Sequence, residues 1–128
     1  MKLLVDTCTF LWIAGGGREL PARVAALYRA PENEVYLSAI SAWEIAVKHS
    51  NGRLPLPEAP QLFVPAECVR LGVASLPFDE ESALHVSRLP LLHRDPFDRM
   101  LVSQAIVHGL TILTPDHLIA QYPARTIW

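Results

Sequence analysis

The chain has 128 residues, of which 51% are apolar, enough for a single folded domain with a sizeable core and too many for a disordered chain. Eleven Lys and Arg residues against 13 Asp and Glu residues give a net charge of −2, which argues against a generic basic nucleic-acid binder. Two cysteines exclude a disulfide scaffold and a cysteine-based zinc site. With no signal peptide or membrane span recognisable, we expect one domain over residues 1–128, located in the cytoplasm.

Short apolar runs alternate along the chain with helical segments. We expect strands at residues 2–5, 34–37, 73–76, 110–113 and 124–128. We expect helices at residues 7–14, 21–29, 39–49, 61–70 and 96–108, one opening at 79–81, and a single turn at 117–121. This order predicts an α/β fold, with a central, mostly parallel sheet between helices. In such sheets, binding sites form beyond the carboxyl ends of the strands.

Candidate capping residues mark the ends of two helices. Ser38 or Ser41 can cap the helix at 39–49. At the helix 96–108, Asp95 suits the N-cap, Pro96 suits the first helical position, and Gly109 suits the C-cap. The segment from Asp95 to Asp98 therefore places two carboxylates at the head of one helix.

Four of the five aspartates stand at a strand exit or at this helix head: Asp6, Asp95, Asp98 and Asp116. Hard cations such as Mg²⁺ take oxygen ligands, often from only one or two carboxylates plus waters. Each acid also has a structural explanation, as a helix cap, a capping-box partner or a turn residue. The joint pattern predicts that these acids meet in space as a metal-dependent nuclease site.

Glu44 falls on a partly apolar helical stripe with Ile40 and Val47. A carboxylate on such a face needs a partner or a metal ion. The alternative is an exposed i,i+4 pair with Lys48.

For several other polar and aromatic residues, the sequence allows either a functional or a purely structural role. Arg94 and Arg99 flank the acid pair and are candidates for phosphate binding, or they balance local charge. Trp12 and Trp43 fit a core better than a base-stacking platform. Three histidines without zinc spacing are candidate ligands or bases, or simply solvated side chains: His49, His93 and His117.

Four ordered segments together resemble PIN-domain ribonucleases, and more narrowly VapC-type toxins of bacterial toxin–antitoxin pairs. They are Leu-Val-Asp-Thr at 4–7, Ser-Ala-Ile-Ser-Ala-Trp-Glu-Ile-Ala-Val-Lys at 38–48, His-Arg-Asp-Pro-Phe-Asp-Arg-Met-Leu-Val-Ser-Gln-Ala at 93–105, and Gly-Leu-Thr-Ile-Leu-Thr-Pro-Asp at 109–116. Leu11-Trp12 behind the first segment and the terminal Trp128 complete the set. The resemblance covers essentially the whole chain and implies a PIN-like three-layer α/β/α sandwich. Where many relatives have a basic residue before the last acid, this chain has Pro115.

The resemblance also implies an activity and a site. The family's acidic quartet falls on Asp6, Glu44, Asp98 and Asp116 as catalytic residues. The implied metal ligands are Asp6, Asp98 and Asp116, with Glu44 and Asp95 as further candidates. The implied cofactor is Mg²⁺ or Mn²⁺, and the implied reaction is hydrolysis of RNA by activated water, without a nucleophilic side chain.

Partners are implied in the same way. The resemblance implies a homodimer inhibited by a cognate antitoxin, with DNA reached only through the antitoxin. We expect the antitoxin to dock as an amphipathic segment in a groove made by the proline-rich loop after residue 52 and the helices at 21–29 and 39–49.

Two other functions compete with the ribonuclease. One is a phosphoaspartyl phosphatase with Asp6 as nucleophile, but position 8 is Cys8 where that chemistry usually has a second Asp. The only lysines, Lys2 and Lys48, also leave that enzyme without its downstream lysine. The other is a catalytically inactive PIN-fold binding module, against which the complete acidic quartet speaks.

Overall fold

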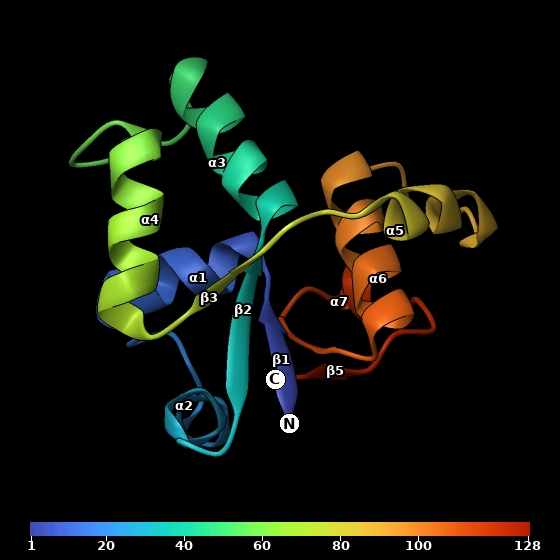
Figure 1. The fold of residues 1–128 in the computed structure, drawn as a ribbon, viewed down its shortest axis with the longest axis horizontal. Helices are drawn as coiled ribbons and strands as arrows, with labels where there is room; N and C mark the ends of the chain where they lie inside the picture. Colours follow the sequence, from blue (N-terminus) through green and yellow to red (C-terminus); the bar gives the residue numbers. More distant parts are fainter.

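A computed structural model describes residues 1–128 as a parallel five-stranded sheet flanked by helices (Figure 1). The strands are β1 (Lys2–Val5), β2 (Glu34–Ser38), β3 (Ala74–Leu76), β4 (Thr111–Leu113) and β5 (Thr126–Ile127). The helices are α1 (Thr7–Ala14), α2 (Ala22–Arg29), α3 (Ala39–Ser50), α4 (Pro60–Leu71), α5 (Glu80–His85), α6 (Pro96–His108) and α7 (His117–Ala120), with a 3₁₀ turn η1 (Val86–Arg88).

The sheet has the order β3-β2-β1-β4-β5, and each neighbouring pair is parallel. In the central strand, Leu4 is in register with Tyr36 of β2 and with Ile112 of β4. Because all five strands run in one direction, their carboxyl ends share one edge of the sheet. Helices α1, α3 and α7 begin beyond that edge, after β1, β2 and β4 respectively.

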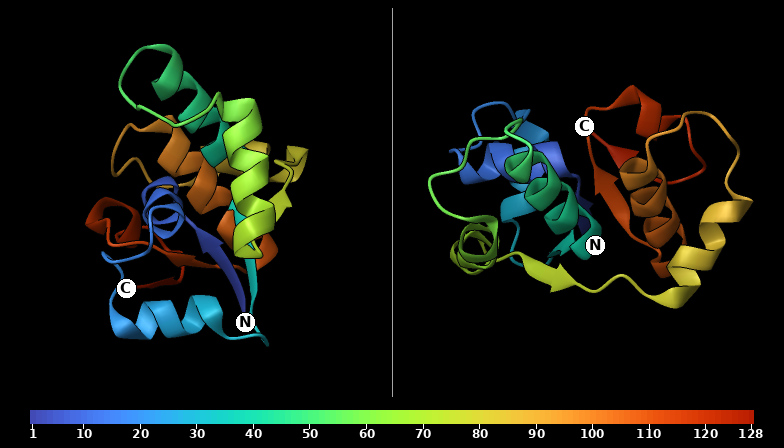
Figure 2. Two further views of the ribbon diagram at one scale, coloured as in Figure 1. Left: turned by 90° about the vertical axis from the view of Figure 1, so that its left-hand side faces the viewer. Right: turned by 90° about the horizontal axis from the view of Figure 1, so that it is seen from above.

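Both faces of β1 are buried, as expected for a parallel strand with helices on either side. Leu3 and Val5 belong to one apolar cluster, together with residues of α1, α2, α3 and α4. Leu4 belongs to a second cluster, with residues of α6 and α7. Two views at right angles show these helix sets on opposite sides of the sheet (Figure 2). The expected three-layer α/β/α sandwich is therefore confirmed.

Most element boundaries fall within one or two residues of those expected, and the exceptions have local causes. Ser38, and not the buried Ser41, caps α3, because its hydroxyl accepts a hydrogen bond from Ile40 N at 3.1 Å. Gly109 ends α6 with φ +65°, a conformation that side chains with a Cβ rarely adopt. The last strand is only Thr126–Ile127, shorter than the expected 124–128.

The expected antitoxin groove does not form between the helices at 21–29 and 39–49. Helices α2 and α3 lie at opposite ends of the molecule (Figures 1 and 2). Helix α3 packs instead beside α4, and a groove of about 780 Å³ with a largely apolar lining lies between them. We call it the α3–α4 groove. No helix of the fold is both long enough and apolar enough to cross a bilayer.

Candidate active site

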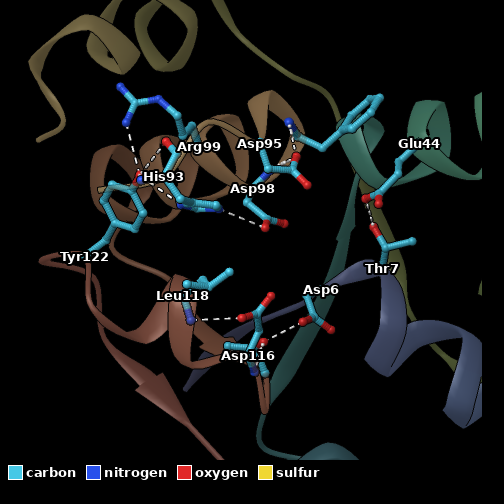
Figure 3. Close-up of polar contacts among 12 residues, drawn as sticks. Asp6, Thr7, Glu44, His93, Asp95, Asp98, Arg99, Asp116, Leu118 and Tyr122 are labelled. Atoms are coloured by element: carbon cyan, nitrogen blue, oxygen red, sulfur yellow. Dashed lines mark hydrogen bonds and ion pairs between the residues drawn. The ribbon is translucent and has the colours of Figure 1, made fainter. Parts of the chain in front are cut away.

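Five carboxylates line one open cavity of about 380 Å³ at the carboxyl edge of the sheet, which we call the acidic cavity. They lie within, or at the N-cap of, four helices from both flanking layers, and they are Asp6, Glu44, Asp95, Asp98 and Asp116. Figure 3 shows the aspartates around a common space, with Glu44 to one side, beside Thr7. All the acids singled out in the sequence are thus brought together, although what each does there stays a prediction.

Asp6 and Asp116 are joined through one hydroxyl. Asp6 caps α1, since its Oδ1 accepts from Thr9 N at 2.8 Å, and its Oδ2 accepts from the hydroxyl of Thr114. The same Thr114 oxygen accepts from Asp116 N at 3.0 Å, and Asp116 caps α7 by accepting from Leu118 N at 2.9 Å. The capping roles considered from the sequence are therefore real. They use one carboxylate oxygen of each acid and leave Oδ2 of Asp116 without a hydrogen bond.

Glu44 combines the two roles that the sequence left open. Its Oε2 accepts from Lys48 Nζ at 2.5 Å, the expected i,i+4 pair, but Glu44 is buried, with 7% of its surface exposed. Its Oε1 accepts from the Thr7 hydroxyl at 2.6 Å, which ties α3 to the head of α1. The hydrogen bond to Glu44 also raises the pKa of Lys48. Glu44 is thus a buried, fully partnered carboxylate at the wall of the cavity.

The two acids at the head of α6 have different partners: Asp95 caps the helix, whereas Asp98 contacts a histidine. Asp95 is the cap, with its Oδ1 accepting from Phe97 N at 2.9 Å and from Asp98 N at 3.2 Å. Asp98 takes no part in a capping box. Its Oδ2 lies 3.1 Å from Nε2 of His93. Asp98 is therefore oriented by a histidine and not by the helix backbone.

Burial and mutual repulsion disfavour the charged form of two acids. Burial raises the pKa of Asp6, against the lowering effect of its hydrogen bonds from Thr114 and Thr9. Burial is also the largest cause raising the pKa of Asp98 to about 6, and the hydrogen bond with His93 opposes it.

Neighbouring negative charges add to the effect on Asp98. They come from Asp95, Asp116 and Glu44, each of which raises its pKa further. A cavity in which carboxylates repel one another is one in which a bound cation is stabilised.

The donor set fits a hydrated divalent cation better than a fully enclosed one. All five acids offer hard oxygen ligands, and the lining contains no imidazole. Cys8 also lines the cavity, and burial raises its thiol pKa to about 11, which disfavours the free thiolate. No three His, Cys, Asp or Glu side chains stand close enough to hold an ion between them. Mg²⁺ usually keeps several waters and needs only one or two carboxylates, which an open cavity can provide.

The expected phosphate-binding role of Arg99 is wrong. Its guanidinium is buried and donates to Pro90 O at 2.8 Å, Tyr122 OH at 3.1 Å and Val86 O at 3.2 Å. These bonds hold it away from the acidic cavity, which it does not line. Arg94 is exposed next to Asp95, and its role in substrate binding stays a prediction.

The expectation that Trp43 lies in the core is also wrong. Its side chain is 53% exposed and packs edge-on against Phe97, with ring centroids 5.0 Å apart. Trp12 is half-buried and lies against Trp128. Of the three candidate histidines, only His93 contacts an acid of the cavity, because the ring of His49 faces Leu54 O and His117 is exposed.

Sequence reasoning overlooked the hydroxyls that position the acids. Thr7 and Thr114 each hold a carboxylate, and both stand at a strand exit beside an expected acid, which is the signal that was available. Arg53 lines the cavity from the loop after α3. Nothing in the sequence marks it, since its position depends on the path of that loop.

We compared the chain with protein families and with known proteins. A family model described as the PIN domain matches residues 3–124, almost the whole chain. Ribonuclease VapC16 from Mycobacterium tuberculosis is 38% identical over 60 residues, which is 47% of this chain and 43% of that protein. The similarity in sequence to this relative therefore spans less than half of either protein.

Solved structures extend the likeness to the complete fold. A chain of VapBC2 from Rickettsia felis, bound to a DNA fragment from its promoter, has a TM-score of 0.76 and 16% identity, with 99% of this chain and 98% of that chain covered. A chain of DNA-bound VapBC from Salmonella typhimurium has a TM-score of 0.69 and 20% identity, with 99% and 97% covered. At these identities the likeness concerns the fold alone. Together with the family model it leads to one conclusion: the chain belongs to the PIN-domain family.

Proposed function

We propose that this chain is a metal-dependent endoribonuclease and the toxin of a toxin–antitoxin pair. The observation that carries the proposal is the acidic cavity, in which five carboxylates meet at the carboxyl edge of a PIN-fold sheet. The similarity to a VapC ribonuclease and to chains of VapBC complexes supports the choice of RNA as substrate.

Asp6, Asp98 and Asp116 would hold the ion, directly or through its waters, with Glu44 and Asp95 as further ligands to those waters. A bound Mg²⁺ or Mn²⁺ would supply Lewis-acid activation of water and neutralise charge that develops on the phosphate.

Side chains of the protein would position the carboxylates and bind the phosphates. The hydroxyl of Thr114 fixes the carboxylate of Asp6, and the hydroxyl of Thr7 fixes that of Glu44. Lys48 and Arg53 are the cations that line the cavity, and in this proposal they would meet the phosphates of a bound strand. Because the chain carries no basic excess, we expect binding to depend on this local pair and on the metal.

An RNA cleavage assay tests the proposal. The purified chain should cleave single-stranded RNA with Mg²⁺ or Mn²⁺, lose this activity in EDTA, and regain it when either ion is restored. Zn²⁺ should support it poorly, because every candidate ligand is an oxygen. A folded protein that leaves RNA intact with both ions would make the inactive binding module the better description.

We further propose an antitoxin as partner and a homodimer as the active form. The α3–α4 groove has the volume and apolar lining that could receive the apolar face of an amphipathic segment. In this scheme the chain acts in the cytoplasm and meets DNA only through the antitoxin. The DNA bound in the VapBC complexes from Rickettsia felis and Salmonella typhimurium supports DNA as a partner of such a complex.

A further inference from the structure

A chain of hydrogen bonds leads from the buried Arg99 to Asp98 of the acidic cavity (Figure 3). Arg99 Nη1 donates to Tyr122 OH at 3.1 Å, and Tyr122 OH lies 3.0 Å from Nδ1 of His93. On its other side, the His93 ring places Nε2 3.1 Å from Oδ2 of Asp98. Arg99 and Tyr122 are both buried, with 9% and 3% of their surfaces exposed. The links between them are therefore shielded from competing water.

The surroundings of Tyr122 OH decide which ring nitrogen of His93 carries the proton. This oxygen has two lone pairs and one proton. Two N–H groups point at it, Nη1 of Arg99 at 3.1 Å and the backbone N of His93 at 3.2 Å, and these occupy both lone pairs. Its single proton then goes to Nδ1 of His93 at 3.0 Å, which is closer than His93 O at 3.4 Å. Nδ1 is therefore the acceptor, and Nε2 carries the hydrogen that is donated to Asp98.

The same bonds fix the loop that delivers His93. Arg99 also donates to Pro90 O at 2.8 Å, and Tyr122 OH receives the backbone N–H of His93. The loop between η1 and α6 is thus held at both its start and its end by buried side chains. The ring of His93 packs against that of Tyr122, with centroids 5.4 Å apart. The imidazole consequently has a defined place and a defined tautomer before any ligand arrives.

We propose that His93 is a positioning residue: through Nε2–H it holds Oδ2 of Asp98 and turns Oδ1, which no protein group contacts, toward a cation in the acidic cavity. Tyr122 and Arg99 keep His93 in the tautomer that this requires. The proposal rests on the proposed metal-dependent cleavage, and it assigns His93 no contact with substrate. Outer partners of this kind commonly change metal affinity or activity by about 10- to 100-fold.

Two substitutions separate the contact with Asp98 from the anchoring of the loop. His93→Asn keeps a polar group near the position of Nδ1 and so preserves the link to Tyr122, but it is too short to reach Asp98. His93→Gln places its amide near the position of Nε2 and restores a donor to Asp98. The matched control is His108→Ala, which removes another His–Asp pair (His108 Nε2 to Asp79 Oδ1, 2.7 Å) at the far end of the same helix.

The measurements are kcat and KM for RNA cleavage and, without RNA, the Kd for Mn²⁺ by calorimetry. We expect His93→Asn to lower kcat and weaken Mn²⁺ binding by about 10- to 100-fold, with KM for RNA unchanged. His93→Gln should recover most of both, and His108→Ala should match the wild type. Melting curves should show all three variants folded.

Three other outcomes would overturn either the positioning role of His93, the ribonuclease proposal, or both. If His93→Asn, His93→Gln and the wild type share one kcat and one Mn²⁺ affinity, the positioning role is overturned while the ribonuclease stands. If the wild type does not cleave RNA but Mn²⁺ affinity follows the expected order of variants, the ribonuclease proposal fails and the positioning role survives. A wild type that neither cleaves RNA nor binds Mn²⁺ overturns both.

Discussion

Asp98 stands at the head of α6 and lines the acidic cavity, where the role of its charge can be tested without changing its shape. Its pKa is raised to about 6, by burial first and then by neighbouring acids, so its carboxylate is held at an electrostatic cost. Asp98→Asn keeps an oxygen that can accept from His93 but removes the charge. We expect cleavage to fall by orders of magnitude, with an unchanged or slightly higher Tm, because functional sites often carry such repulsion.

The two assays for this prediction are metal-dependent cleavage and a thermal melt. Asp79→Asn is the matched control, since Asp79 also pairs with a histidine, His108, but does not line the acidic cavity. Full cleavage by a folded Asp98→Asn protein would remove Asp98 from the site.

Asp95 allows the opposite prediction, because its observed bonds are those of a cap. Asn accepts the same two backbone hydrogens, from Phe97 N and Asp98 N, so Asp95→Asn should retain stability and most activity. Asp95→Ala should cost about 1 kcal/mol, the usual size of a lost cap. Urea unfolding and the cleavage assay check both variants. Loss of cleavage in a stable Asp95→Asn protein would make Asp95 a metal ligand.

At the scale of elements, the junction between β4 and α7 depends on one hydroxyl. Thr114→Val preserves shape but leaves Oδ2 of buried Asp6 without a donor and Asp116 N without an acceptor. We expect a loss of about 1–3 kcal/mol in unfolding free energy, the range for a buried polar group left unpaired, and reduced cleavage. Thr114→Ser keeps the hydroxyl and should lose much less. Equal stability of the Val and Ser variants in urea unfolding would show that the junction does not depend on this bond.

The contact between α5 and α6 gives a prediction for pH. The hydrogen bond from His108, followed by those from Ser82, lowers the pKa of Asp79 in the folded chain. A depressed carboxyl pKa stabilises the fold above the unfolded value of about 3.9, and this contribution is lost as pH falls through the folded value. The wild type should therefore melt above Asp79→Asn at pH 5, and the difference should shrink as the pH drops below about 4. A difference in Tm that stays constant from pH 5 to pH 3 would contradict the assignment.

Sequence pattern predicted the elements well, and failed where the outcome depends on side-chain direction. Asp6 and Asp116 were found because a strand exit fixes the place of a residue, and parallel strands bring those exits together. Arg99 was misassigned because its position next to Asp98 in sequence cannot tell whether its side chain points into the cavity or back toward Tyr122. Trp43 was misassigned for the same reason, since α3 turns it away from the core while Glu44 beside it is buried.

At the scale of the whole molecule, the proposed functions occupy separate surfaces. The α3–α4 groove is lined by α3 residues such as Ala46, whereas the acidic cavity lies at the sheet edge. Ala46→Arg should fill the groove and abolish co-purification with the antitoxin, while cleavage by the isolated chain persists. Ala22→Arg, an exposed change on α2 at the far end of the molecule, should leave co-purification intact. The reverse result would move the docking site to α2.

Three of the five acids in the cavity, Asp6, Asp95 and Asp116, double as helix caps. Asparagine caps a helix about as well as aspartate, and a single base change converts an aspartate codon to an asparagine codon. Mutation of Asp6 or Asp116 to asparagine can therefore silence the chemistry without unfolding the chain. Under the proposed function, a cell that survives its own toxin by such a mutation would still make a folded, inactive protein. That protein would still bind the antitoxin. Such copies would act as decoys and free an active sibling from restraint, so selection would act on the pair of genes and not on the toxin alone.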